Sequence, residues 1–137
     1  MRHGRKVKKL GRTKSHREAM IKNMIRSLIT YERIKTTVAK AKLVRPYMER
    51  LVRYALENTL AKKRLINRWV CDHGLVKKLC DEIAPRFTNH QGGYTRVLKL
   101  GYHRPGDSAE MALIEFAVRA PKKEEAKAKS QKTEKKK

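Results

Sequence analysis

The sequence is poor in the residues that disulfide frameworks, catalytic sites and membrane spans require. Its 137 residues include two cysteines, 6% aromatic residues and only 13 Asp and Glu against 36 Lys and Arg, for a net charge of +23. Cys71 and Cys80 lack a second cysteine pair, which fits reduced thiols better than a disulfide framework or a zinc ribbon. No apolar run approaches the ~18 residues of a membrane span. We therefore expect one compact intracellular domain without a membrane segment.

The few carboxylates form no evident catalytic group. Asp81 and Glu82 are adjacent, so on a helix they point in different directions, which argues against a two-carboxylate or two-metal nuclease site. Cys71, His73 and Cys80 match no usual zinc spacing and lack a fourth ligand. We therefore predict a protein that is not an enzyme and has no cofactor, metal or small-molecule substrate.

The positive charge is unevenly distributed. Residues 1–17 contain eight Lys and Arg and no acid, and residues 121–137 contain eight Lys and three Glu. We divide the chain into a basic N-terminal arm (1–14), a globular domain (15–118) and a Lys-rich low-complexity tail (119–137). The tail has too few apolar residues to offset the entropy of ordering, so we expect it to be disordered. Its lysines fit a solvated segment as well as a polyanion-binding one.

A chain this cationic is suited to a dense polyanion, because neutralising phosphates releases condensed counterions. The arm alternates Arg and Lys with Gly4 and Gly11, so groups that contact phosphate are separated by flexible joints. An anionic membrane fits less well, since no apolar face accompanies this charge. The composition therefore predicts a nucleic-acid partner, with RNA favoured.

The apolar residues of the first two thirds of the chain recur at helical spacing. Ser15 and Glu18 have the spacing of a capping box, which predicts a helix start at Ser15. Pro46 should kink or break the second helix near Arg45, because proline removes a backbone donor. Gly74 should separate the third and fourth helices, and Pro85 should end the fourth. The predicted helices are 15–28, 38–57, a short segment around 62–70, and 75–83.

Three segments alternate as β-strands do: 33–37, 94–100 and 111–118. The last two flank a turn at Arg104-Pro105-Gly106-Asp107, which predicts an antiparallel pair. The sequence therefore predicts an α+β fold, with about four helices packed on a small, about three-stranded mixed sheet.

Basic residues surround Gly92-Gly93, which lacks the context of a nucleotide phosphate loop and is better suited to positive backbone dihedrals before a strand. Tyr94 adds an aromatic group there. Such a loop can hold RNA backbone, although a hairpin entry with solvated charges explains any single residue equally well. We expect Arg96, on a half-exposed strand, to be replaceable by Ala at a cost within about 0.5 kcal/mol. The surrounding donors are Arg86, His90, Arg96, Lys99 and Arg104.

The chain contains, in this order, the motifs Met1-Arg2-His3, Ser15-His16-Arg17, Ile34-Lys35-Thr36-Thr37 and Gly92-Gly93-Tyr94-Thr95-Arg96. In their order and spacing they resemble the family of the seventeenth protein of the bacterial large ribosomal subunit. The resemblance covers nearly all of 1–118, and the tail from about Arg119 lies outside it. Because it begins at Met1, we expect no uncleaved transit peptide. The matching segments are Met1-Arg2-His3, Ser15-His16-Arg17, the 20–28 helix, Ile34-Lys35-Thr36-Thr37, Lys40-Ala41-Lys42, Pro85-Arg86-Phe87, Gly92-Gly93-Tyr94-Thr95-Arg96 with Lys99, Gly106-Asp107, Met111 and Ile114-Glu115.

The resemblance implies a cytoplasmic structural protein that binds 23S rRNA near the peptide tunnel exit, beside neighbouring large-subunit ribosomal proteins, and that is not an obligate homo-oligomer. Two alternatives are an architectural nucleic-acid-binding protein, which should show a recognition helix or minor-groove wedge, and an RNA-processing factor, which needs a convergent catalytic set. The predicted RNA-binding residues are Arg2, His3, Arg5, Lys6, Lys8, Lys9, Arg12, Lys14, His16, Arg17, Lys22, Arg26, Lys35, Lys40, Lys42, Arg86, Arg96 and Lys99.

Overall fold

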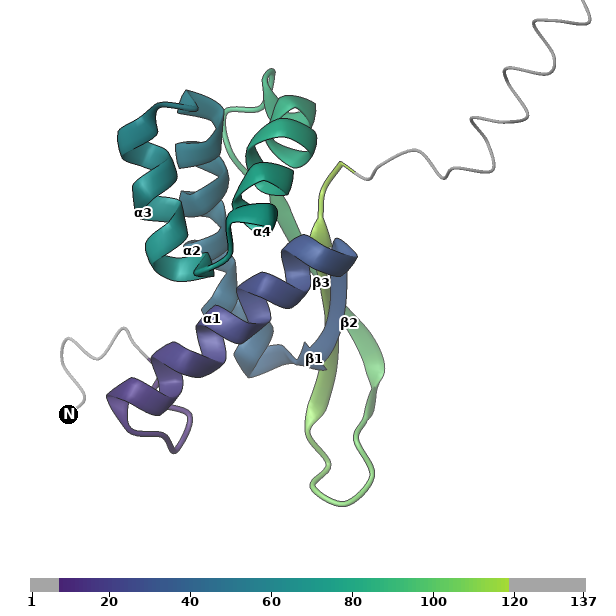
Figure 1. The fold of residues 1–137 in the computed structure, drawn as a ribbon. Helices are drawn as coiled ribbons and strands as arrows, with labels where there is room; N and C mark the ends of the chain where they lie inside the picture. Colours follow the sequence, from purple (N-terminus) through teal and green to yellow (C-terminus); the bar gives the residue numbers. More distant parts are fainter. Residues whose placement is uncertain (1–7, 119–137) are drawn as a thin grey trace, which may run out of the picture.

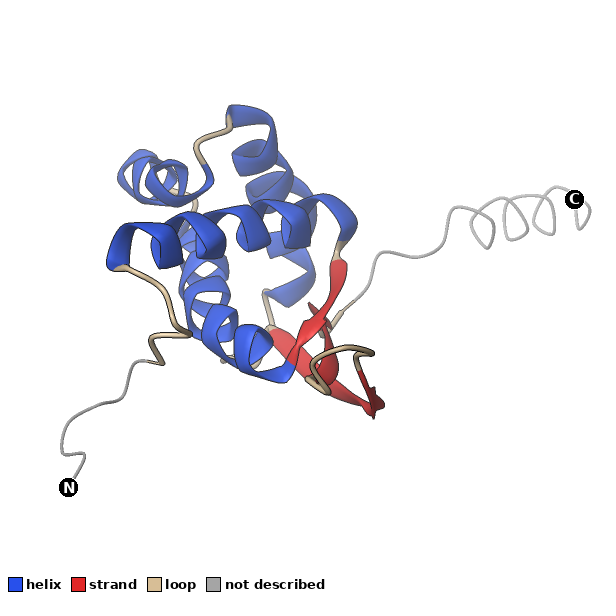
Figure 2. Ribbon diagram, turned by 90° about the horizontal axis from the view of Figure 1, so that it is seen from below, coloured by secondary structure: helices blue, strands red, loops and turns tan. Residues whose placement is uncertain are grey.

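The computed structural model describes residues 8–118, which fold into four α-helices packed against one face of a three-stranded sheet (Figure 1). The α+β class is therefore confirmed. Both strand pairings are antiparallel, so the sheet is not mixed as predicted. Viewed from below, the helices lie on one side of the strands (Figure 2). Within 8–118, no helix combines the length and the apolarity that crossing a membrane would require.

The first helix begins slightly before its predicted start. Helix α1 spans Lys14–Tyr31 and follows an extended Thr13, whose side chain makes no capping hydrogen bond. The predicted capping box is therefore wrong. Ser15 has helical backbone, whereas a capping residue needs extended backbone to aim its oxygen at the free amides.

Helix α2 spans Val38–Glu57 without a break, although Pro46 lies inside it. Of the predicted kink or break, the break is therefore wrong and the kink stays a prediction. Pro46 removes the donor to the carbonyl of Lys42, and both residues are exposed. At an exposed position that carbonyl can hydrogen-bond water instead, which offsets the lost hydrogen bond, although not the contact of the proline ring with the carbonyl.

Helix α3 (Leu60–Val70) and helix α4 (His73–Lys78) are separated by two residues, Cys71 and Asp72. Cys71 has a left-handed backbone (φ 52°) and ends α3. The Asp72 carboxylate caps α4 by accepting a hydrogen bond from the Leu75 amide at 3.1 Å. The separation is therefore not at Gly74, which lies inside α4. After α4 a π-helical turn (Leu79–Ile83) and a 3-10 turn (Ala84–Phe87) carry helical backbone past Pro85. Pro85 is tolerated because it occupies the first turn of the 3-10 segment, where no backbone donor is needed.

The sheet contains β1 (Arg33–Thr37), β2 (Thr95–His103) and β3 (Glu110–Phe116), with β3 in the centre. The prediction of an antiparallel β2 and β3 pair is confirmed, and β1 has its predicted bounds. The β2–β3 hairpin projects beyond the helices (Figure 1).

The core lies between the helices and the inner face of the sheet. Phe87 is its aromatic centre, at 5.5 Å from the Tyr94 ring and 6.2 Å from the Phe116 ring. Trp69 is partly buried against Tyr47, as expected of a core anchor, with ring centroids 4.9 Å apart. The largest fully buried side chains are Phe87, Phe116, Ile21, Ile25, Leu28, Ile29, Met48, Leu51, Ile66, Leu79, Ile83 and Ile114.

Candidate nucleic-acid interface

The predicted arm lies partly outside the described residues, which begin at Lys8. Arg2, His3, Arg5 and Lys6 are therefore not placed. Lys8, Lys9 and Lys14 are exposed. Arg12 lies 3.3 Å from His16 through their side-chain nitrogens, and Arg17 donates to the Arg12 carbonyl at 3.3 Å. Five predicted cations and His16 thus gather where the arm joins α1.

Arg86 is a predicted RNA contact that the fold uses for itself. Its two terminal nitrogens donate to the two carboxylate oxygens of Glu32 at 2.8 and 3.0 Å, and both side chains are largely buried. Glu32 is the left-handed residue (φ 60°) that ends α1. The bidentate pair therefore connects the 3-10 turn to the junction between α1 and β1, a geometry that only arginine supplies.

Arg96 also has an internal partner. Its Nε lies 2.6 Å from Glu115 Oε1, and the Glu115 side chain has no exposed surface while Arg96 is 49% exposed. Replacing Arg96 by Ala would remove a partner from a buried carboxylate, which is far more destabilising than a surface substitution. The expectation that this substitution has little effect on stability does not fit this geometry.

Arg26 is similarly engaged, because its Nε donates to the Val70 carbonyl at 2.5 Å and so satisfies the C-terminal end of α3. Lys35 Nζ lies 4.7 Å from the centroid of the Tyr102 ring. Lys99 pairs loosely with Glu110 at 3.8 Å, and both side chains are well exposed, so this pair leaves the ammonium accessible. Lys42 is exposed, whereas Lys22 and Lys40 are partly buried.

Three arginines that the sequence analysis did not assign surround a groove of about 400 Å³ between α2 and the start of β2. The side chain of Arg45 is half exposed, and Arg50 and Arg53 are exposed. Arg50 and Arg53 lie on the side of α2 opposite its buried stripe, so their helical spacing was a usable signal, whereas Arg45 lies at the edge of that stripe. The groove is lined by Arg45, Pro46, Glu49, Arg50, Arg53, Gly92 and Tyr94.

Glu49 fixes the geometry of this groove. Its carboxylate accepts from the backbone amides of Tyr94 and Thr95 at 3.0 and 2.8 Å, and from the Thr95 hydroxyl at 2.6 Å. Arg45 approaches the same carboxylate only to 4.0 Å. Because the three hydrogen bonds from Tyr94 and Thr95 occupy most of the acceptor capacity of this carboxylate, the neighbouring guanidinium groups keep donors for an external anion.

Gly92 and Gly93 bring exposed backbone to the edge of this groove. Gly93 has the predicted positive φ, at 70°, and a Cβ there would meet no atom within 4 Å. The requirement for glycine is therefore conformational and not steric. The open space above this backbone leaves room for a polyanion to approach it closely.

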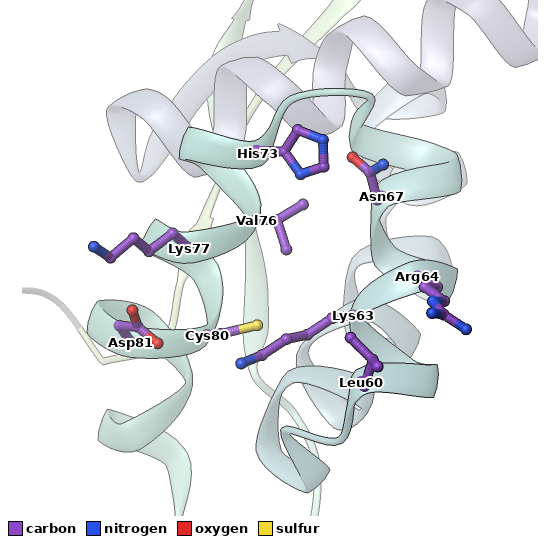
Figure 3. Close-up of a pocket in the computed structure, with 9 residues that line it drawn as sticks. All are labelled: Leu60, Lys63, Arg64, Asn67, His73, Val76, Lys77, Cys80 and Asp81. Carbon is purple, nitrogen blue, oxygen red and sulfur yellow. The ribbon is translucent and has the colours of Figure 1, made fainter.

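A second groove, of about 540 Å³, lies between α3 and α4 (Figure 3). Lys63 extends from α3 toward Cys80 and Asp81 on the opposite wall. Cys80 is buried, which raises the pKa of its thiol, and Cys71 is exposed; both are free. Residues 8–118 contain no cluster of His, Cys, Asp and Glu able to hold a metal. The groove lining is Leu60, Lys63, Arg64, Asn67, His73, Val76, Lys77, Cys80 and Asp81.

Comparison with known proteins identifies the family. Residues 20–117 match the family model described as ribosomal protein L17. The chain is 50% identical to a large ribosomal subunit protein bL17 of Maridesulfovibrio salexigens over 120 residues, which cover 88% of this chain and 85% of that protein. Relatives of the same name from Nitratidesulfovibrio vulgaris and Fusobacterium nucleatum are each 48% identical, over 90% and 85% of this chain and 96% and 99% of their own lengths. The chain therefore belongs to the ribosomal protein L17 family, whose members are ribosomal proteins and not enzymes.

Proposed function

We propose that this protein is a structural constituent of the large ribosomal subunit that binds and stabilises 23S rRNA near the peptide tunnel exit, in the cytoplasm. The relatives are named as large-subunit proteins, which supports the assignment to that subunit. In this role the protein supports translation through binding alone.

The observation that carries the proposal is the arginine groove, the set of Arg45, Arg50 and Arg53 beside Gly92. Among the lining residues that the structure describes, the carboxylate is that of Glu49, and it accepts from the backbone amides of Tyr94 and Thr95 at the start of β2. Arginine forks around exposed backbone match the phosphates of a folded RNA strand, which such proteins recognise by shape. The cations at the junction of the arm and α1 supply a second contact region.

Neighbouring large-subunit ribosomal proteins complete the proposed surroundings, and we infer no obligate homo-oligomer. The groove between α3 and α4 is a separate surface with a mixed lining of cations, apolar groups and Asp81. The RNA contact is assigned to the arginine groove and to the arm.

The native cysteines allow a direct test of the location. Cys71 is exposed and Cys80 is buried, so an iron chelate attached to the folded full-length protein should modify Cys71 selectively. After incorporation into large subunits, hydroxyl radicals from the chelate should cleave 23S rRNA strands that line the tunnel exit. A Cys71→Ser protein treated in the same way is the control.

Each outcome of these measurements tests a different part of the proposal. Cleavage confined to distant rRNA would overturn the tunnel-exit location but keep the subunit assignment. Failure to co-sediment with large subunits in high salt would overturn the proposed function itself. Equal affinity for duplex DNA and for rRNA would favour the architectural nucleic-acid-binding alternative.

A further inference from the structure

The outer face of the sheet, on the side opposite the helices, carries two cross-strand rows of side chains. Strand register places Arg33, Glu115 and Arg96 in one row, and Lys35, Leu113 and Leu98 in the next. Directly opposed residues of antiparallel strands point to the same face, so each row is a set of neighbours. The alternate residues of β3, which are Ala112, Ile114 and Phe116, are buried against the helices.

This outer face leaves large apolar and aromatic groups uncovered. Leu98 and Tyr102 are each 43% exposed, and Leu113 is partly buried between Lys35 and Leu98. The contact with Lys35, at 4.7 Å from nitrogen to ring centroid, places the Tyr102 ring beside the second row. An apolar patch with an aromatic ring, rimmed by charge, is typical of a binding surface.

Among the residues of the two rows on the outer face, every exposed charge is positive. Arg33, Lys35 and Arg96 are exposed, whereas the side chain of Glu115 has no exposed surface. The occupant that complements this face is therefore anionic and has a flat apolar part. A second copy of the same face would bring like charges together, and the Lys-rich sequence of the tail is equally unsuited.

We propose that the outer face is a stacking platform for an unpaired base of the bound RNA. Tyr102 and Leu98 contact the base, and Lys35 and Arg33 contact the adjoining phosphates. Aromatic side chains and arginine planes on sheets are a general solution for holding single-stranded RNA. The inference rests on the proposed function, because both require RNA binding, but it adds contact with a base to contact with the backbone.

Lys35 makes the platform ready for binding before RNA arrives. Its ammonium group over one part of the Tyr102 ring restricts the ring, so less side-chain entropy is lost when a base stacks on the exposed part. The same ammonium group lies within reach of a phosphate attached to the stacked nucleotide. Lys35 and Tyr102 together therefore supply a stacking surface for the base and a positive charge for its phosphate.

The experiment compares two RNA probes that differ only in bases: a 12-nucleotide oligouridylate and an abasic oligoribonucleotide of the same length. Full-length protein is titrated with each probe at several salt concentrations. Wild type should bind the oligouridylate about tenfold more tightly, because stacking of one base has an effect of that order. Tyr102→Ser should reduce this ratio to near one and leave the salt dependence of abasic binding unchanged, whereas Tyr102→Phe should keep the ratio.

Tyr31→Ser is the matched control, because Tyr31 is 71% exposed at the end of α1 and outside the two rows. It should keep the wild-type ratio. Thermal unfolding establishes that each variant is folded, and Tyr102→Leu replaces Tyr102→Ser if the latter unfolds.

Equal binding of the two probes by wild type would overturn the stacking platform while leaving RNA binding, and so the proposed function, intact. Absence of binding to either probe at low salt would count against both. Loss of the ratio in Tyr31→Ser, or its survival in a folded Tyr102→Ser protein, would also overturn the platform. A concentration-dependent dimer that Tyr102→Ser abolishes would assign the face to a second copy instead.

Discussion

Arg86 in the 3-10 turn and Arg96 on β2 have the opposite role to the arginines exposed on α2, although the residue type is the same. Arg86 and Arg96 direct their guanidinium groups at the internal carboxylates Glu32 and Glu115. Arg50 and Arg53 are exposed around a groove whose own carboxylate is engaged by β2. In a protein with 36 basic residues, the position of the few acids therefore decides which cations build the fold and which remain for a ligand.

The largest expected effect comes from breaking the pair on the sheet. Arg96→Ala should lower the free energy of unfolding by roughly 2–3 kcal/mol, less than the 3–5 kcal/mol of a fully buried pair because Arg96 is 49% exposed. Urea unfolding of the full-length protein measures this change.

The double variant Arg96→Ala/Glu115→Gln is the control, since Gln removes the buried charge that Arg96→Ala leaves behind. It should be more stable than the single variant. A double variant that is no more stable would show that the buried charge of Glu115 is not the source of the loss.

A smaller effect on stability is expected where β2 begins beside the arginine groove. Gly93→Val should destabilise the protein by about 1–3 kcal/mol, because φ is 70° there and a β-branched residue is poorly tolerated in that region. Gly93→Asn, which tolerates left-handed backbone, should have a clearly smaller effect. Thermal unfolding of the two variants tests this, and equal losses would mean that the backbone conformation is not the constraint.

Removing the exposed arginines should leave the fold intact and weaken RNA binding. Arg50→Gln/Arg53→Gln should change the unfolding free energy by no more than about 0.5 kcal/mol per site. The slope of log affinity against log salt should fall by about 0.7–0.9 for each phosphate that the variant no longer neutralises. Lys62→Gln/Lys77→Gln removes the same charge from the other helices and should change the slope less. Equal slopes for the two double variants would mean that the arginine groove has no special role.

The smallest effect is expected at the hairpin tip. Arg104 hydrogen-bonds Asp107 and, with the Ala109 amide, lowers the pKa of that carboxyl from 3.8 to about 2. A lowered pKa in the folded state stabilises the protein above pH 3.8, and this contribution is lost as the pH falls toward 2. Asp107→Asn should therefore differ slightly from wild type in thermal unfolding at about pH 6 and converge with it near pH 2. A difference that grows at low pH would contradict the sign of this linkage.

The local sequence pattern was sufficient to predict those helices and strands whose signals lie within a few neighbouring residues. The alternation of Arg33–Thr37 and the apolar stripe of Val38–Glu57 predicted β1 and α2 with their observed bounds. The start of α1 was misplaced because Thr13 and Ser15 are both plausible caps, and only the folded backbone selects between them.

The RNA-binding surface was less predictable, because the carboxylate that pairs with a given arginine lies far from it in the sequence. Glu32 and Arg86 are 54 residues apart, and Arg96 and Glu115 are 19 apart, so no local pattern marked these arginines as structural. Arg50 and Arg53 were missed although their spacing opposite the apolar stripe of α2 was visible. Distinguishing the two groups requires knowing where the strands place the carboxylates.

The position of β3 at the centre of the sheet also constrains when the protein can fold. β1 ends at Thr37 and its partner β3 begins at Glu110, so β1 has no strand to pair with until almost the whole domain has been synthesised. β2 joins β3 through a short hairpin, so only the pairing of β1 with β3 requires closure of a long loop, which slows it. The helices can therefore form early on a nascent chain, whereas the sheet and any surface built on it arise only in a final step, after the C-terminal strand has left the ribosome.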